Sequence, residues 1–193
     1  MKIVCVLGSP RLDGNSAVIA KRFCNAVKNR GADVQTFALN KLKFRGCQGC
    51  MLCKTKLDKC ALDDNLTEVL DSIRDCDFLV MASPTYFGEV SSQLKGFIDR
   101  TYSYLVPDYR TNPEQSRLPP GKKMMFIQTQ GKSDENYFND VFPRYDHFFQ
   151  WLGFKNNYLI RACGVLDKGA VENREDVMKL VDDAAKKVMA GKR

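Results

Sequence analysis

The sequence predicts an α/β fold in which helices cover both faces of a five-stranded parallel sheet. Strand and helix signals alternate along the 193 residues, and the strands are continuous apolar runs, as expected of strands buried on both faces. Right-handed crossovers favour the strand order 2-1-3-4-5. No linker, repeat or low-complexity segment interrupts the pattern, so we expect a single domain over residues 1–193.

Each element has its own local signal. Gly31 closes the first helix, Asp64 or Asn65 can cap the second, and Glu68 is placed to complete a capping box from Asn65. Ser83-Pro84 is expected to break the third strand. The strands are expected at 3–7, 34–39, 78–82, 123–128 and 157–162, and the later helices at 90–104, 136–152 and 171–189, with a surface excursion at 105–121.

Composition narrows the class of protein. A net charge of +7 favours anionic partners, but no helix carries the basic run typical of nucleic-acid binders, so we expect no nucleic-acid partner. The apolar runs are too short to cross a bilayer, and Met1 leads directly into a strand without a cleavage site. We therefore expect a cytoplasmic protein without a membrane partner, whose eight cysteines form no disulfide framework.

The turn after the first strand is a candidate phosphate site. In such sheets ligands bind beyond the carboxyl ends of the strands, and the start of the following helix offers backbone N–H groups and partial positive charge. Hydroxyl, amide and guanidinium donors gather in this turn, which also contains Gly14; they are Ser9, Arg11, Asn15 and Ser16. The simpler alternative is that Asn15 or Ser16 is an ordinary helix N-cap.

Two other phosphate motifs are excluded. A dinucleotide-binding G-x-G-x-x-G fingerprint would need glycine at Pro10. A Walker loop ending in Gly131-Lys132-Ser133 would need glycine at Phe126.

The loops after the third and fourth strands could hold a planar ring. A redox-active ring needs an apolar or aromatic wall and backbone groups that meet its polar edge. The candidates after strand three are Pro84, Thr85, Tyr86, Phe87 and Gly88, and those after strand four are Thr129, Gln130 and Gly131. The alternative is that Tyr86 and Phe87 are core aromatic residues.

Together, the segments GSPR(x)2GNS, SPTYFG and SSQLKGFIDR resemble the NADPH-dependent FMN reductase family of the flavodoxin superfamily. The resemblance implies a flavodoxin-like fold that binds FMN, with NAD(P)H as a possible electron donor. It assigns the FMN phosphate to Ser9, Arg11, Asn15 and Ser16, and the isoalloxazine to 84–88 and 129–131. It also implies a homodimer or homotetramer formed partly by the helix that includes 93–100.

Four cysteines lie in a loop at about 40–62. Cys47, Cys50 and Cys53 follow one another in C-x-x-C steps, and Cys60 comes after six further residues. This spacing is typical of ferredoxin-type clusters, whereas structural zinc sites more often separate two such steps by a longer insert. Zinc and bare or redox-active thiols remain alternatives. The other four, Cys5, Cys24, Cys76 and Cys163, are expected in the core.

The cysteine spacing resembles that of the iron–sulfur flavoproteins, a branch of the same family that binds a [4Fe–4S] cluster beside FMN. That resemblance makes Cys47, Cys50, Cys53 and Cys60 the expected cluster ligands. Six lysines and arginines lie in this segment, and their positive charge would offset the negative charge of a thiolate-bound cluster.

The leading expectation for function is an FMN-dependent oxidoreductase that passes electrons from NAD(P)H or a reduced carrier to a small-molecule acceptor. Because hydride transfer to a flavin needs positioning more than proton chemistry, we name no catalytic acid or base. The alternative is an electron-transfer protein that links ferredoxin to an acceptor through the cluster and FMN. A redox or nucleotide sensor is a third, non-catalytic possibility.

Overall fold

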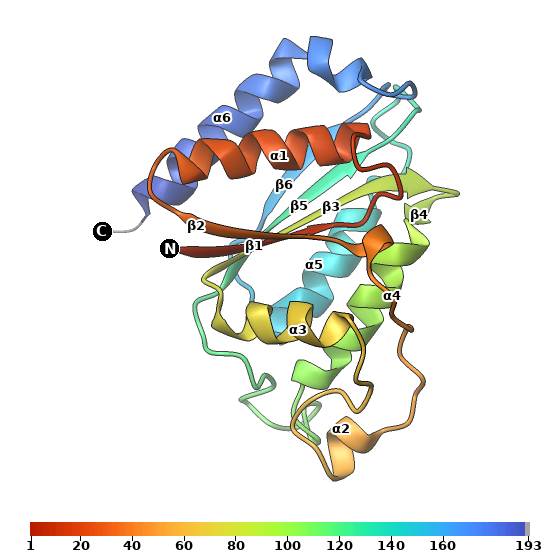
Figure 1. Ribbon diagram of the computed structural model, residues 1–193, viewed down its shortest axis with the longest axis vertical. Coiled ribbons are helices and arrows are strands. Elements are labelled where there is room, and N and C mark those ends of the chain that lie inside the picture. Colours follow the sequence, from red (N-terminus) through yellow and green to blue (C-terminus); the bar gives the residue numbers. More distant parts are fainter. Residues whose placement is uncertain (192–193) are drawn as a thin grey trace.

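The computed structural model describes residues 1–191 and contains a central sheet covered by helices on both faces (Figure 1). Five parallel strands lie in the order β2-β1-β3-β5-β6, as predicted, and the short strand β4 pairs antiparallel with β3. The strands are β1 (Lys2–Leu7), β2 (Asp33–Ala38), β3 (Phe78–Tyr86), β4 (Glu89–Val90), β5 (Lys123–Thr129) and β6 (Tyr158–Ala162).

Helices α1 (Asn15–Lys28) and α6 (Glu175–Ala190) cover one face of the sheet, and α3 (Leu66–Asp75), α4 (Ser92–Arg100) and α5 (Val141–Trp151) cover the other (Figure 1). A single-turn helix, α2 (Leu52–Thr55), lies in the cysteine loop. The 3-10 turns are η1 (Leu39–Lys41), η2 (Thr101–Tyr104) and η3 (Ala170–Asn173). No helix within residues 1–191 is long and apolar enough to cross a membrane.

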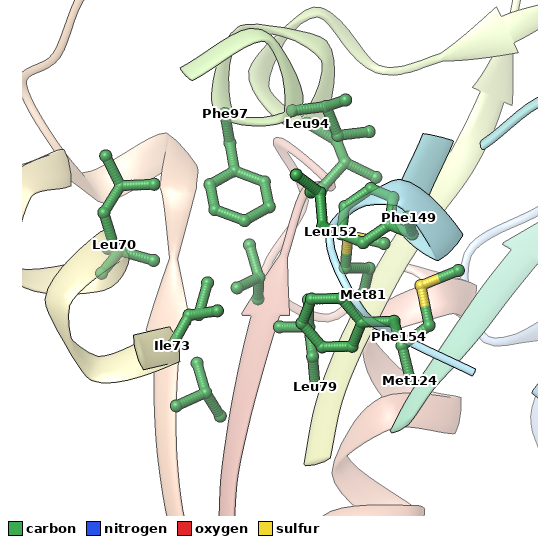
Figure 2. Packing of buried hydrophobic residues seen from close by; sticks show 14 of the residues in the cluster. Leu70, Ile73, Leu79, Met81, Leu94, Phe97, Met124, Phe149, Leu152 and Phe154 are labelled. Carbon is green, nitrogen blue, oxygen red and sulfur yellow. The ribbon is translucent and has the colours of Figure 1, made fainter. Parts of the chain in front are cut away.

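The core forms two layers because alternate residues of each strand face opposite sides of the sheet. In β3, Leu79 and Met81 pack under α3, α4 and α5, whereas Phe78 and Val80 pack under α1 and α6. Figure 2 shows the first layer, in which side chains from the three helices and from Leu152, directly after α5, converge on the strands; those of the helices include Leu70, Ile73, Leu94, Phe97 and Phe149.

The expected break at Ser83-Pro84 is wrong, because β3 continues to Tyr86. The pairing of β3 with β1 ends at Ala82, whereas its pairing with β5 continues to Pro84 opposite Thr129. Beyond Ala82 the β1 side of the strand is therefore an edge, where a proline that lacks an N–H removes no ladder hydrogen bond. The strand then turns through Phe87-Gly88 and pairs with β4.

Of the two expected caps of α3, Asp64 supplies the side-chain hydrogen bond: Asp64 Oδ1 accepts from the Leu66 N–H at 3.0 Å, while Asn65 Oδ1 accepts from the Lys43 N–H. Two further helices begin later than expected. The helix expected at 90–104 begins at Ser92, since Val90 belongs to β4, and ends in the 3-10 turn η2. Helix α6 begins at Glu175, after η3.

Helix α5 begins at Val141 instead of residue 136. Arg161 of β6 donates hydrogen bonds to the backbone carbonyls of Glu135 and Tyr137, which holds this segment in a non-helical path. Phe138 has φ +62°, in the left-handed region. The segment at 105–121 lacks regular structure, as expected, but it is not purely a surface excursion, because Leu105 and Leu118 are buried in the core.

Candidate functional site

Four segments at the carboxyl ends of β1, β3, β5 and β6 line one cavity that encloses about 150 Å³. This is less than a pocket that fully encloses a drug-sized ligand, so a nucleotide would be held here by only part of its surface. The residues that line the cavity are Ser9, Arg11, Gly14, Asn15, Ser16, Pro84, Thr85, Tyr86, Thr129, Gln130, Gly131, Val165, Leu166 and Lys168.

The turn between β1 and α1 is held close to the sheet. The Gly8 N–H donates to the Ala82 carbonyl at 2.8 Å, and a Cβ at Gly8 would lie 2.7 Å from Leu94 Cβ. Only glycine fits at this approach. Within the turn, Ser9 Oγ accepts from the Arg11 N–H at 3.1 Å, which curves the chain around the start of α1.

The start of α1 carries an unpartnered donor. Ser16 is 1% exposed, and its hydroxyl has no hydrogen-bond partner although it lines the cavity. Gly14, the residue before α1, supplies no side-chain cap. The first N–H groups of a 14-residue helix and a buried free hydroxyl thus face the same space, an arrangement suited to an anion.

The Asn15 side chain is hydrogen-bonded within the chain. Its side-chain amide donates to the carbonyls of Val165 and Asp167 at 3.0 and 2.8 Å, and its Oδ1 accepts from the Val171 N–H at 3.2 Å. Both amide hydrogens are therefore used within the chain. Although Asn15 lines the cavity, its side chain ties the loop after β6 to the start of α1.

The loop after β6 was not among the expected site elements. Val165, Leu166 and Lys168 line the cavity beside the predicted loops. The rule that parallel strands end at the same edge of the sheet applies equally to the loop after β6 and could have identified it. A Cβ at Gly131 would lie 2.8 Å from Leu166 Cδ1, so the two loops are in close contact.

The residues that were expected to follow the third strand separate into two groups. Pro84, Thr85 and Tyr86 line the cavity, whereas Phe87 and Gly88 form the turn of the β3–β4 hairpin and do not. Phe87 has φ +50° and a fully exposed side chain, so it is not a core aromatic residue. Tyr86 is 43% exposed at the cavity mouth.

The residues after β5 all line the cavity. The Gln130 side chain is fixed, because its amide donates to the Lys132 and Asp134 carbonyls and its Oε1 accepts two hydrogen bonds from Arg161. Gln130 thus shapes the wall of the cavity. Thr129 is 3% exposed at the end of the strand.

The cavity wall is positive. Arg11 and Lys168 line it, and Lys168 forms an ion pair with Asp13 across the turn. The hydrogen bond from Lys168 lowers the pKa of the Asp13 carboxyl. Two cations and a helix N-terminus against one carboxylate give the site a net preference for an anionic ligand.

The candidate metal ligands occupy a separate region beyond the C-terminal end of α4 (Figure 1). Cys47 and Cys50 are exposed, Cys60 is half-buried and Cys53 is buried at the start of α2. Helix α4 runs between the cavity and this region, and its nine residues span about 14 Å. None of the residues that line the cavity belongs to the cysteine loop.

The structure does not gather the four thiols around one point, because no three His, Cys, Asp or Glu side chains of residues 1–191 lie where they could share a metal ion. The donor chemistry nevertheless suits iron and sulfide, since all four cysteines are free thiols. A buried donor, Arg100 Nε, is also left without a partner beside this loop. The donor set and this orphaned group suit an iron–sulfur cluster in their chemistry, whereas the positions of the four thiols do not form its site.

The remaining cysteines were expected in the core, and three of them lie there. Cys5, Cys24 and Cys76 are each at most 5% exposed. Cys163 is half-buried and outside both core layers, so that expectation is wrong for it: residue 162 completes β6, and Cys163 lies in the turn that follows.

The chain matches a known protein family. The family model of the NADPH-dependent FMN reductases matches residues 1–135, which include β1 to β5 and three of the four segments that line the cavity. The chain belongs to the NADPH-dependent FMN reductase family.

Curated relatives of this family member include iron–sulfur flavoproteins. One from Methanocaldococcus jannaschii is 35% identical over 101 residues, 52% of this chain and 52% of its own length. A second from the same organism is 31% identical over 149 residues, 77% of this chain and 70% of its own length. In the first of these, as in several others, the matched segment spans only about half the length of the relative.

Solved structures share the fold. An FMN-dependent NADH-azoreductase from Bacillus anthracis, determined in complex with FMN, superposes with a TM-score of 0.73 at 18% identity and covers 97% of this chain and 99% of its own. The agreement confirms the flavodoxin-like architecture that the sequence predicts.

Proposed function

We propose that the chain binds FMN in the cavity at the carboxyl edge of the sheet and uses it to pass electrons from NAD(P)H to a small acceptor. The observation that carries this proposal is the buried Ser16 hydroxyl, unpartnered beside the N-terminus of α1. A buried donor without an acceptor is costly, and a phosphate oxygen is a strong acceptor that would satisfy it.

In this proposal each loop has a separate task. Ser9, Ser16 and the first backbone N–H groups of α1 hold the phosphate, and Arg11 supplies a positive charge from the rim. Asn15 positions the loop after β6. The ring would lie between the β3 residues Pro84, Thr85 and Tyr86 and the β5 residues Thr129, Gln130 and Gly131.

FMN, when bound, supplies the redox chemistry by accepting a hydride and releasing electrons to an acceptor. The protein's contribution is to orient the ring and leave one face open. Tyr86 and the exposed turn at Phe87-Gly88 lie where a nicotinamide or an acceptor would approach. The azoreductase neighbour makes azo compounds reasonable acceptors to assay.

The test is anaerobic reduction of the FMN-loaded protein. Addition of NADH or NADPH should bleach the visible flavin spectrum, and an acceptor should restore it. If neither nicotinamide reduces the bound flavin, the reductase proposal is wrong even where FMN binds.

A second function is favoured by a specific observation, the C-x2-C-x2-C-x6-C spacing in a chain whose relatives are named iron–sulfur flavoproteins. In this version Cys47, Cys50, Cys53 and Cys60 hold a [4Fe–4S] cluster that relays electrons between a carrier such as ferredoxin and FMN. Cys50→Ser should remove the cluster's EPR signal and leave the flavin spectrum. A wild-type protein purified without oxygen and found free of iron would refute this version alone.

We also propose that the chain forms a homo-oligomer through an aromatic groove of about 610 Å³ beside α4 and α5. Tyr102, Tyr109 and Trp151 line it, and Phe148 is 52% exposed there. Because Cys47 lines the same groove, a second copy would bring its own residues close to the cysteine loop. In light scattering, the wild type should have the mass of a multimer, and Phe148→Glu should give a smaller species. A monomeric wild type would refute the proposal.

A further inference from the structure

A buried lysine lies in the cysteine loop. Lys54 is 8% exposed, and its Nζ donates to the carbonyls of Tyr102 and Leu105, each at 2.6 Å. The ammonium also lies 4.1 Å from the centre of the Tyr102 ring. These contacts attach α2 to the turn after α4 and fix the position of the neighbouring Cys53.

A buried arginine closes the base of the same loop. Arg100, the last residue of α4, is 0% exposed. Its Nη1 donates to the Arg45 carbonyl at 2.8 Å and its Nη2 to the Leu62 carbonyl at 3.0 Å. Arg45 precedes the first cysteine and Leu62 follows the last, so one guanidinium joins the two ends of the cysteine loop.

The region contains more buried positive than negative charge. Arg100 pairs with Asp64 at 2.8 Å, whereas Lys54 takes part in none of the ion pairs found in residues 1–191. Arg117 adds a third cation, since its Nη1 donates to the Leu105 carbonyl that also binds Lys54. A buried cation without a counter-charge is costly. Neutral thiols do not offset it, but an anionic group bound to them would.

Both cations lie in or against the segment that carries the thiols. Lys54 directly follows Cys53, and both residues are buried. Arg100 binds the carbonyl of Leu62, two residues after Cys60, and its Nε is buried with no hydrogen-bond partner. The excess positive charge therefore lies next to Cys53 in the chain and at the end of the cysteine segment that Cys60 occupies.

We propose that Lys54 and Arg100 are positioning residues of the thiol site, which order Cys53 and Cys60 and balance the negative charge of a cluster held by the four cysteines. This inference rests on the iron–sulfur version of the proposed function and assigns the residues that the thiol spacing alone does not reveal. Lys54 contributes mainly charge, whereas Arg100 contributes charge and the closure of the loop.

The test compares Lys54→Met with Lys56→Met, a matched change at an exposed lysine two residues away. Proteins reconstituted anaerobically with iron and sulfide are assayed for the rate of iron release to a chelator, the midpoint potential of the cluster, flavin content and unfolding midpoint. Lys54→Met should release iron about tenfold faster. Its cluster potential should shift to more negative values, because a nearby positive charge favours the reduced, more anionic state. Lys56→Met should match wild type, and Lys54→Arg should restore the potential.

Arg100→Lys separates the charge of Arg100 from its role in closing the cysteine loop. It also replaces Lys54→Met as the test if that variant does not fold. It should keep the potential of wild type and release iron faster, because a lysine cannot span both carbonyls. The inference is overturned if Lys54→Met releases iron at the same rate as Lys56→Met and has the same cluster potential. It is also overturned if Arg100→Lys releases iron at the wild-type rate. A wild type that takes up no iron overturns both this inference and the cluster proposal, while FMN binding is judged separately from the flavin content.

Discussion

The Ser91 hydroxyl donates a hydrogen bond to the Gly8 carbonyl at 2.6 Å, joining the start of α4 to the loop after β1. Ser91 is 0% exposed, its Oγ accepts from the Leu94 N–H at 3.3 Å, and its N–H donates to Ser83 Oγ at 2.9 Å. One side chain thus connects the candidate phosphate loop, the end of β3 and a helix cap.

Ser91→Ala should lower the free energy of unfolding by about 2 kcal/mol, because it removes a helix cap and leaves the Gly8 carbonyl without this donor. Urea denaturation measures the change. Ser92→Ala, at an exposed neighbour, is the control and should change stability by less than about 0.5 kcal/mol. Equal effects of the two changes would contradict the linking role of Ser91.

Ser16→Ala should weaken FMN binding about tenfold, since it removes a hydrogen bond to a charged phosphate. Because the Ser16 hydroxyl has no partner in the free protein, the stability of the apoprotein should be unchanged or slightly higher. Fluorescence titration with FMN and thermal unfolding of the apoprotein provide the two measurements. A large loss of apoprotein stability would show that Ser16 serves the fold and not a ligand.

Gly8→Ala should destabilise the protein by about 2 kcal/mol, because the new Cβ would lie 2.7 Å from Leu94 Cβ and 3.1 Å from the Ala82 carbonyl oxygen, both in the packed core. At Gly131 the nearest atom is the end of the Leu166 side chain, which is 75% exposed and free to move. Gly131→Ala should therefore cost less than about 0.5 kcal/mol in the same unfolding assay. The reverse order would mean that the loop after β6 is more rigid than its exposure indicates.

Stability should fall in acid through Asp64. Burial raises the pKa of this carboxyl, but hydrogen bonds from Arg100 and from the Arg45 and Leu66 N–H groups outweigh burial and lower the pKa below its ordinary value of 3.8. A lowered folded-state pKa means that the contribution is present above about pH 4 and lost as pH falls through the folded-state value.

Asp64→Asn should accordingly cost about 3 kcal/mol at pH 7, because Arg100 is left buried without a counter-charge. The difference in the free energy of unfolding between the variant and wild type should shrink as pH falls from 5 toward 2. The exposed neighbour variant Asp63→Asn should show neither effect. A difference that stays constant with pH would contradict the role of the Asp64 charge.

Much of this fold and site follows from local sequence signals. Buried strands such as 78–82 are recognisable as apolar runs, and the edge rule brings Ser16, Pro84 and Thr129 to one cavity from three distant segments. What could not be predicted depends on tertiary contacts. The late start of α5 depends on Arg161 binding the carbonyls of Glu135 and Tyr137, a contact no local pattern contains.

The same reason explains the other differences. Pro84 is tolerated in β3 because β1 ends earlier, and the relative lengths of neighbouring strands are not visible in either segment alone. Asn15 carries an amide that could donate to a ligand, but this amide donates to the carbonyls of Val165 and Asp167, at least 150 residues away in the sequence. The roles of the loop after β6 and of Lys54 likewise depend on contacts that form only in the folded chain.

Binding of a phosphate-bearing flavin at the N-terminus of α1 is tested by a paired titration of the wild-type apoprotein with FMN and riboflavin. The two ligands share the ring and differ in the phosphate. FMN should bind at least about a hundredfold more tightly than riboflavin, because several N–H and O–H donors meet the phosphate. Equal affinity for the two flavins, or binding of neither, would contradict this prediction.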